Sequence, residues 1–304
     1  MNNIHLPKQL SYVFLLGNLG DSLIEMITIH HFVKTGYHVT VLSDNLRELQ
    51  QWFPSHKISP IPKNKKKLIK VLQSFDQLIL FHNEVKHFSV SLTPLLKKSP
   101  IIFEQLRLFY RDRISIASIY KNILENYFDF QAVGIDNGLV PPADLIHRQF
   151  KNWVSIHVTA GEFHRTYLPK RFIKLAHKLK TKGFDCYFIV APFEYKTWVW
   201  VKKHGIQLPQ FSSLNEMASF LYESGYFIGN DSGLGHLASN LGIPTLSLFI
   251  RSKLYKRWYP IWSPHLAIVA PPILILTSLK MKYWKYLIPW QRVYCKFRKL
   301  LQLS

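Results

Sequence analysis

Two glycine-containing segments of the sequence carry side chains that could bind an anionic ligand. The first, residues 17–22, reads GNLGDS and contains one carboxylate, Asp21. The second, residues 228–249, reads IGNDSGLGHLASNLGIPTLSLF and places a carboxylate, a hydroxyl and an imidazole close together in the run DSGLGH. Each segment follows an apolar run and precedes a helical pattern, where the free backbone N–H groups of a helix N-terminus can bind an anion.

Asp21 has two interpretations. It lies near the start of a predicted helix at residues 21–34, where the helix dipole favours its ionised form. Acidic residues at such positions commonly cap the helix, and the segment alone favours that interpretation. The alternative is a ligand-binding loop, because the glycines of this segment allow a tight turn and the close approach of a ligand. The segment is neither a P-loop nor a dinucleotide fingerprint, because GK[ST] and GxGxxG are both absent.

The second segment is the more specific of the two. It offers a hydroxyl, an imidazole and unblocked backbone amides at the start of a short helix that runs to Asn240, after which residues 242–244 turn the chain into the next strand. A glycine-rich turn with a core histidine explains parts of this order, but not all of it. The pattern predicts a diphosphate-binding loop on a helix N-terminus. The residues that would form this loop are Asp231, Ser232, Gly233, Leu234, Gly235 and His236.

The elements that position these segments follow from apolar runs and helical periodicity. Residues 11–16 and 37–42 are apolar runs typical of strands, and residues 21–34 between them have a helical pattern. A strand, a loop, a helix and a second strand within about thirty residues indicate a parallel α/β architecture. Further predictions in this half are short strands at residues 78–81 and 101–103 and a charged surface loop at residues 63–67.

The same architecture restarts after Pro141 and Pro142. Strands are predicted at residues 153–158, 187–191, 226–229 and 245–249, and helices at residues 169–182 and up to Asn240. Two such halves predict the α/β class with two Rossmann-like, doubly wound domains that face each other across a cleft. The expected domains are residues 1–145 and residues 146–304.

Composition excludes several classes of protein. The chain has 304 residues, of which 48% are hydrophobic and 14% aromatic, and this rules out a disordered chain. Its two cysteines, Cys186 and Cys295, lie far apart, which excludes a disulfide scaffold and a structural zinc site and fits a reducing compartment. We expect no secretory signal, and no stretch reaches the roughly 18 uninterrupted apolar residues of a membrane-spanning helix. The longest candidate, residues 266–279, contains two prolines. These features predict a soluble or membrane-surface protein.

Positive charge is concentrated toward the C-terminus. The chain has 39 Lys and Arg against 18 Asp and Glu, a net charge of +21, and no acidic residue follows Asp231. From Lys280 onward cations alternate with aromatic residues, a mixture that suits an anionic membrane surface or single-stranded nucleic acid. A solvated basic helix that closes a domain is a third interpretation. Composition alone leaves all three open.

Residues 228–249 closely resemble the signature G-x-D-[ST]-G-x-x-H-L-A-x-x-L-G-x-P-x-x-x-L-F of the ADP-heptose:lipopolysaccharide heptosyltransferases, glycosyltransferase family 9. The run GNLGD that ends at Asp21 resembles the GD loop of that family, and residues 212–224 are similar to the helix that precedes the signature. The resemblance extends in outline over residues 11–249. It implies a GT-B fold whose first domain binds the acceptor and whose second domain binds the nucleotide-sugar donor, without a metal ion or cofactor.

The resemblance also implies roles for single residues. Asp21 matches the general base, which would take the proton from the acceptor hydroxyl in an inverting transfer, and Asn18 and Gly20 lie beside it on the acceptor side. Inverting sugar transfer needs one such carboxylate and charge stabilisation on the leaving diphosphate. Asp231 matches a residue that contacts the donor sugar, and residues 232–236 match the diphosphate loop.

Two further donor residues depend on weaker matches. Glu194, in the run APFE, is similar to the acidic residue that holds the nucleotide ribose, and a surface glutamate on a loop is the alternative. The family usually carries a lysine in a K-x-W-P-like stretch of the second domain. Here residues 164–169 read HRTYLP, which departs from that stretch, and Arg165 is the best cationic substitute.

From the resemblance we expect a glycosyltransferase that moves heptose, or a related sugar, from a nucleotide-diphospho-sugar such as ADP-heptose to the inner core of lipopolysaccharide. Its acceptor would be anionic and lie in a membrane. We therefore expect a cytoplasmic protein, bound peripherally to the inner face of the inner membrane through its basic C-terminal tail, with no nucleic-acid partner. The alternatives are a family 9 enzyme that uses another sugar donor for a surface glycan, a non-catalytic member, and a basic nucleic-acid-binding protein, for which no recognised motif is present.

Overall fold

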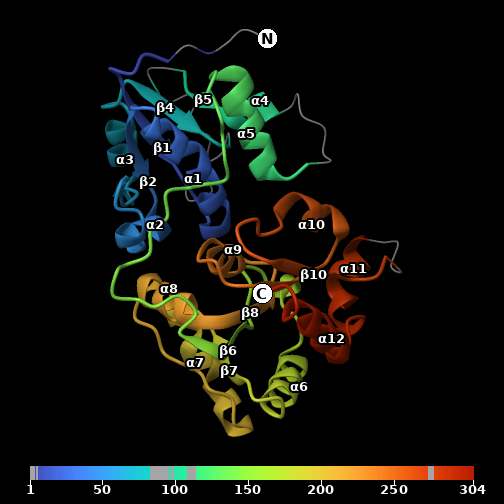
Figure 1. Cartoon of the computed structure of the whole chain (residues 1–304). Coiled ribbons are helices and arrows are strands. Elements are labelled where there is room, and N and C mark those ends of the chain that lie inside the picture. Colours follow the sequence, from blue (N-terminus) through green and yellow to red (C-terminus); the bar gives the residue numbers. More distant parts are fainter. Residues whose placement is uncertain (1–3, 5, 83–95, 97–98, 108–113, 273–276) are drawn as a thin grey trace. The chain divides into compact units, whose positions relative to one another are not determined.

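Both halves of the chain fold around a five-stranded β-sheet (Figure 1). The computed structural model describes residues 4, 6–82, 96, 99–107, 114–272 and 277–304. The chain divides into two compact units, Met1–Pro142 and Ala143–Ser304, and each unit contains one of the sheets. The paired strands of the described residues run parallel. The predicted α/β class with two parallel sheets is confirmed.

The first unit contains, in chain order, β1 (Ser11–Leu15), α1 (Leu19–Lys34), β2 (His38–Leu42), α2 (Asp44–Glu48), η1 (Gln50–Trp52), β3 (Lys57–Ser59), α3 (Lys65–Leu72), β4 (Gln77–Leu80), β5 (Ile101–Ile102), α4 (Phe103–Arg107) and α5 (Ile116–Tyr127). Its strand order is β3-β2-β1-β4-β5. From β1 the chain adds β2 and then β3 on one side of the sheet. It then returns to the other side of β1 and adds β4 and β5 there. This reversal creates a switch point at the carboxyl ends of β1 and β4, where ligands bind in doubly wound sheets.

Two expectations for this unit are wrong in detail. Helix α1 begins at Leu19, so most of the expected loop at residues 17–22 is the first turn of a helix. The expected charged loop at residues 63–67 contains the start of α3, because the Asn64 side chain accepts hydrogen bonds from two N–H groups of the first turn. An N-cap asparagine satisfies amides that have no partner within the helix, and this outweighs the charge repulsion between neighbouring lysines.

The second unit contains β6 (Phe150–His157), η4 (Phe163–Arg165), α6 (Pro169–Lys180), β7 (Asp185–Ile189), η5 (Pro192–Glu194), α7 (Tyr195–Trp198), η6 (Val199–His204), α8 (Leu214–Glu223), β8 (Ser224–Asn230), α9 (Gly233–Asn240), β9 (Thr245–Phe249), α10 (Ser252–Trp258), β10 (His265–Val269), α11 (Thr277–Tyr283), η7 (Trp284–Tyr286) and α12 (Trp290–Leu300). Its strand order is β10-β9-β8-β6-β7. The winding reverses between β6 and β8, which places the switch point of this unit at their carboxyl ends.

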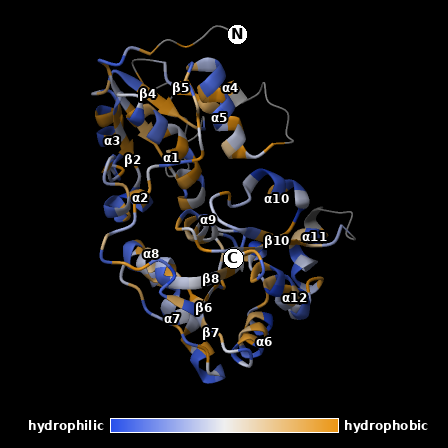
Figure 2. Cartoon of the chain, viewed as in Figure 1, coloured by the Kyte–Doolittle hydropathy of each residue, from blue (hydrophilic) through white to orange (hydrophobic). Residues whose placement is uncertain are grey.

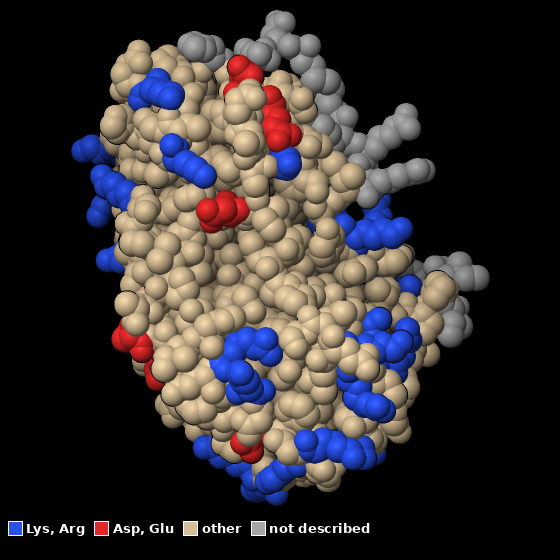
Figure 3. All heavy atoms as spheres, in the orientation of Figure 1, with Lys and Arg blue, Asp and Glu red and all other residues tan. Residues whose placement is uncertain are grey.

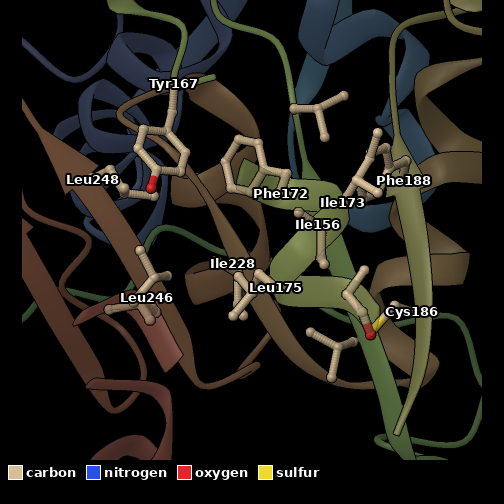
Figure 4. Close-up of a cluster of buried hydrophobic side chains, with 14 of the residues drawn as sticks. Ile156, Tyr167, Phe172, Ile173, Leu175, Cys186, Phe188, Ile228, Leu246 and Leu248 are labelled. Carbon is tan, nitrogen blue, oxygen red and sulfur yellow. The ribbon is translucent and has the colours of Figure 1, made fainter. Parts of the chain in front are cut away.

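The core of the second unit joins its strands to one face of α6 (Figure 4). Strand β8 is buried along its whole length, as expected for a central parallel strand covered on both faces. The apolar face of α6 that the sequence indicates, which includes Phe172 and Leu175, is buried. Each such side chain stabilises the fold by about 1.5–3 kcal/mol when it is fully buried. This packing holds the loops at the carboxyl ends of β6 and β8 in place.

The basic C-terminal segment belongs to the same core. Val293, Phe297 and Leu300 are buried on one face of α12, which packs against α6 and the edge of the sheet, and Trp284 is also fully buried. Polar residues cover the other face of α12, so the helix shows blue, hydrophilic segments and orange, hydrophobic segments in Figure 2. The segment expected as a tail is therefore a folded element that closes the second unit. Trp284 and Phe297 are not accessible to a membrane or to a nucleic acid.

The longest apolar run of the sequence begins inside the sheet of the second unit. Residues 265–269 form its edge strand β10, and residues 273–276 lie outside the described part of the chain. Within the described ranges, none of the helices has the length and apolarity required to cross a bilayer.

Candidate functional site

The start of helix α9 lies at the switch point of the second unit. Ser232 is the N-cap residue, with extended backbone angles, but its side chain makes no capping hydrogen bond to the helix. The hydroxyl is instead 2.9 Å from Nδ1 of His157, at the end of β6. The amides of the first turn, at Gly233 and Leu234, are therefore not covered by the cap side chain. A helix start of this kind favours an anionic ligand through its N–H groups and its dipole.

Arg165 and Asp231 form an ion pair across the switch point. Arg165 lies in η4, after β6, and Asp231 follows β8, and Nη2 of the arginine donates to Oδ2 of the aspartate over 2.6 Å. The aspartate side chain is 12% exposed and the arginine side chain 34% exposed. The two residues lie 66 positions apart in the sequence. The structure thus brings together two of the predicted donor residues, and the pair fixes the orientation of the Asp231 carboxylate.

Ser232 is also the first member of a chain of hydrogen bonds that reaches Glu194. The second link joins Nε2 of His157 to the Thr159 hydroxyl over 3.0 Å, and that hydroxyl donates to Oε2 of Glu194 over 2.9 Å. The same carboxylate oxygen accepts the N–H of Ala191 over 2.9 Å. Glu194 is therefore anchored at the carboxyl end of β7 and is not a free surface side chain.

This chain of hydrogen bonds defines the tautomer of His157. Burial lowers the pKa of His157 to about 4, so its ring is neutral at pH 7 and carries one proton. The single hydroxyl proton of Thr159 goes to the carboxylate, so the Thr159 oxygen must accept the Nε2 proton of the histidine. Nδ1 then accepts the hydroxyl proton of Ser232. In this arrangement the Ser232 hydroxyl has no proton left for a phosphate, and backbone amides must supply the donors.

His236 is a buried residue of the predicted diphosphate loop. It is 5% exposed, and its Nδ1 has no hydrogen-bond partner within the described part of the chain. Burial, with a smaller contribution from the Arg165 cation, lowers the pKa of His236 to about 4. Its ring is therefore neutral at pH 7 and adds no positive charge to the site. The neighbouring His265, in β10, has a pKa lowered by burial to about 3.

Asn230 connects the loops of the switch point and is a residue that sequence reasoning missed. Its side chain is fully buried, its Oδ1 accepts the N–H of Tyr167 over 2.9 Å, and its Nδ2 donates to the carbonyl of Thr159 over 3.1 Å. His157 was missed in the same way. The available signal was the position of both residues at the carboxyl ends of buried strands, where polar residues of doubly wound sheets meet ligands.

Asn18, Gly20 and Asp21 lie at the switch point of the first unit, where β1 leads into α1. Asn18 is the N-cap residue, exposed and without a capping hydrogen bond, and its Nδ2 donates to Oδ2 of Asp21 over 3.4 Å. Gly20 is buried in the first turn. Asp21 is partly buried and is the third residue of α1. It is not the N-cap residue, so the interpretation of Asp21 as the helix cap is wrong. Its carboxylate is held by one long hydrogen bond from a side chain.

A second carboxylate lies one helical turn beyond Asp21 and was also missed. Glu25 is 3% exposed, and its Oε1 is 3.6 Å from Nε2 of His82, which follows β4. The other ring nitrogen of His82 is 3.8 Å from Glu104. Residues four positions apart share one helix face, so the spacing of Asp21 and Glu25 was the signal in the sequence.

The structure therefore brings the predicted residues together in two sets. Arg165, Glu194 and Asp231 lie with residues 232–236 at the carboxyl edge of the second sheet. Residues 18–21 lie at the corresponding edge of the first sheet. The first set combines free helix amides, a guanidinium and two anchored carboxylates, which suits a diphosphate attached to a polar group. The second set offers a carboxylate that can accept a proton.

Comparison with known proteins gives a family and a fold. The family model described as glycosyltransferase family 9 (heptosyltransferase) matches residues 66–270, a range that includes the α9 loop and begins after Asp21. The search of curated protein sequences finds no match.

Solved structures match over nearly the whole chain. A glycosyl transferase family 9 structure from Veillonella parvula DSM 2008 has a TM-score of 0.74 at 14% identity and covers 100% of both chains. ADP-heptose lps heptosyltransferase II from E. coli has a TM-score of 0.69 at 14% identity and covers 97% of this chain and 99% of its own. E. coli heptosyltransferase WaaC with ADP has a TM-score of 0.69 at 12% identity, with coverages of 95% and 99%. These similarities confirm the predicted GT-B fold class.

Proposed function

Because the chain belongs to glycosyltransferase family 9 and is a glycosyltransferase, we propose that it transfers heptose, or a related sugar, to the inner core of lipopolysaccharide or lipooligosaccharide. The proposed donor is a nucleotide-diphospho-sugar, with ADP-heptose as the first choice. The observation that carries the proposal is the uncapped start of α9 beside the Arg165–Asp231 pair. The two E. coli heptosyltransferases that share the fold support the choice of donor, since their names specify ADP-heptose and ADP.

In the proposed complex, the donor diphosphate binds the first-turn amides of α9, and Arg165 contributes positive charge. Charge builds up on the leaving diphosphate as the bond to the sugar breaks, and preorganised amides and cations stabilise it without reorganising. Asp231 would contact the sugar, and Glu194 the ribose, because both carboxylates are held at the same sheet edge. The proposal includes no metal ion.

Asp21 is the proposed general base. Its carboxylate takes the proton of the acceptor hydroxyl while the oxygen attacks the anomeric carbon from the face opposite the diphosphate, which inverts the configuration. The sugar–phosphate bond breaks as the new glycosidic bond forms, and the nucleoside diphosphate leaves with its electron pair. Asn18, whose Nδ2 approaches Asp21, would orient the carboxylate.

We further propose that the protein acts in the cytoplasm, peripherally on the inner face of the inner membrane. The net charge of +21 favours an anionic acceptor and an anionic surface. Figure 3 shows Lys and Arg atoms gathered over the part of the second unit where Figure 1 places α6 and α12. Arg292, Arg298 and Lys299 are exposed on α12, and we assign the membrane contact to this face.

The test of the proposed reaction uses a panel of nucleotide sugars and lipooligosaccharides truncated to different depths. The products are analysed by mass spectrometry. A mass increment of one heptose from ADP-heptose is the expected result. An increment of a hexose or hexosamine from another donor would move the enzyme to a different surface glycan, and no increment from any donor would contradict the proposal.

The donor site has its own test. Gly233→Val places a branched side chain at the first residue of α9, where the diphosphate would approach the backbone most closely. We expect weaker binding of ADP in calorimetry, with an unchanged unfolding transition. Wild-type affinity for ADP in this variant would show that the diphosphate does not bind at the start of α9.

A further inference from the structure

Lys285 is a buried lysine beside the loop that carries Arg165. It lies in η7, it is 9% exposed, and its Nζ is 4.5 Å from the ring centroid of Phe163. Phe163 is the first residue of η4, and Arg165 is the last. The phenylalanine ring is itself 85% exposed. The C-terminal segment therefore brings a second cation to the same loop, although nothing in the sequence around Lys285 indicates a donor residue.

The backbone around Lys285 is held firmly in this position. Arg171, in α6, donates from Nη1 to the carbonyl of Lys285 over 3.0 Å and from Nη2 to the carbonyl of Tyr286 over 3.1 Å. The indole N–H of Trp284 donates to the carbonyl of His164 over 2.8 Å, which joins η7 directly to η4. The position of Lys285 is thus fixed by hydrogen bonds of its own carbonyl and of the residues on either side of it.

The ammonium of Lys285 has no counter-charge of its own. Within the described ranges, no ion pair includes Lys285. Of the acids next to η4, Asp231 pairs with Arg165, and Glu162 is exposed and lies 3.1 Å from His164. Arg171 adds a further positive charge nearby, and burial lowers the pKa of Lys285.

A lysine with most of its side chain buried and no acidic partner is uncommon. The stem of Lys285 is covered, whereas its ammonium lies over the exposed ring of Phe163, where a ligand can reach it. An anion bound beside Arg165 would therefore meet a second cation. A diphosphate at the start of α9 is such an anion.

We propose that Lys285 binds the diphosphate of the donor as a second cation beside Arg165. The inference rests on the proposed function, since it assumes a nucleotide-diphospho-sugar at this site. Lys285 would stabilise the negative charge of the leaving diphosphate. The ring of Phe163 would keep the ammonium of Lys285 in position beside this diphosphate. The C-terminal segment is then a part of the donor site and not only a closing element of the fold.

The test compares Lys285→Met with a matched control, Lys282→Met. Lys282 lies in the preceding helix α11, is exposed, and also places its Nζ over an aromatic ring, 5.3 Å from the centroid of Tyr283. Binding is measured by calorimetry for ADP, GDP, UDP and CDP and for the nucleoside of the diphosphate that binds wild type best. We expect Lys285→Met to weaken diphosphate binding about ten- to a hundredfold, with unchanged nucleoside binding. Lys282→Met should bind both like wild type.

Each other result has a definite meaning. Equal diphosphate affinity in Lys285→Met and wild type would overturn the inference about Lys285 and leave the proposed function standing. Failure of wild type to bind any of the four diphosphates would overturn the proposed function as well. If Lys285→Met does not fold, Lys285→Arg and Phe163→Leu replace it. The inference then requires near wild-type affinity in the arginine variant, which keeps the charge, and an affinity loss in Phe163→Leu that is restricted to the diphosphate.

Discussion

At the start of α1, Asn18 and Asp21 occupy different positions of the helix. Asn18 occupies the N-cap position, and Asp21 lies within the first turn with one long hydrogen bond from the Asn18 side chain. A carboxylate that is weakly held and partly exposed can accept a proton and release it again. Because Asp21 is not the N-cap residue, its proposed role as a base can be tested separately from helix capping.

Replacement of Asp21 by asparagine tests its proposed role as general base. General-base catalysis typically contributes about 10²–10⁴-fold, so Asp21→Asn should lower turnover by that order. The unfolding free energy should barely change, because asparagine keeps the size and polarity of the side chain and Asn18 remains as the cap. Donor affinity should persist, since the donor residues lie in the other unit. Turnover within a factor of a few of wild type would remove Asp21 from the mechanism.

At the scale of elements, the proposed donor site depends on the reversal of winding between β6 and β8. Loops from two neighbouring strands leave the sheet there in opposite directions, and Asn230 joins them through its buried side chain. Arg165 and Asp231 come from the same two loops. We therefore expect Asn230 to influence how the Arg165 guanidinium and the Asp231 carboxylate are aligned.

Asn230→Ala should therefore affect both stability and donor binding. The change leaves the N–H of Tyr167 and the carbonyl of Thr159 without their partner in a buried place, at a cost of about 1–3 kcal/mol. Urea unfolding measures this loss, and calorimetry with ADP should show weaker binding. Asn152→Ala is the control, because Asn152 lies on the same strand β6 and makes an exposed hydrogen bond to Asp185. Equal effects of the two changes would contradict the role of Asn230.

At the scale of the whole molecule, buried histidines couple stability to pH. Burial lowers the pKa of His56, His157 and His236 to about 4 and that of His265 to about 3, against 6.5 in an unfolded chain. Above pH 6.5 these groups are neutral in both states, and their contribution to stability is fully present. As the pH falls from 6.5 toward 4, the unfolded chain takes up protons that the folded chain cannot, so stability decreases.

Urea unfolding between pH 7.5 and 4.5 measures this dependence. We expect the unfolding free energy to fall steadily below pH 6.5. His56→Phe should reduce the slope for the first unit, because both ring nitrogens of His56 are buried without hydrogen-bond partners in the described residues and it already packs against Phe53. A flat profile from pH 7 to 5 would show that these histidines bind protons equally well in the folded and unfolded chain, and would contradict their lowered pKa values.

The proposed membrane contact is also a property of the whole molecule. Each cation near an anionic surface contributes roughly 1 kcal/mol, so the combined change Arg292→Gln, Arg298→Gln and Lys299→Gln should release the protein from vesicles that contain acidic lipid. Vesicle sedimentation at fixed salt measures the bound fraction. Wild type should bind neutral vesicles weakly. Equal binding to both kinds of vesicle, or stronger binding to an oligonucleotide, would contradict the proposal.

The sequence by itself determined much of the local structure and predicted most residues of the candidate site. Strand β9 lies where the apolar run predicts it, Thr245–Phe249, and the buried face of α6 follows the helical spacing of its apolar residues. The α9 loop was identified from its order of glycines and polar residues. Signals of this kind act within a few residues of the chain, through strand alternation, helical periodicity and turn chemistry, so they can be read without the fold.

Only the tertiary structure decided which of these residues meet. Arg165 pairs with Asp231 across 66 positions, and His157 binds Ser232 across 75, because β6 and β8 are neighbours in the sheet although β7 lies between them in the chain. The C-terminal segment reads as a basic tail, but its apolar face is buried and it carries Lys285 to η4. Contacts between distant segments depend on strand order and helix packing, which no local pattern encodes.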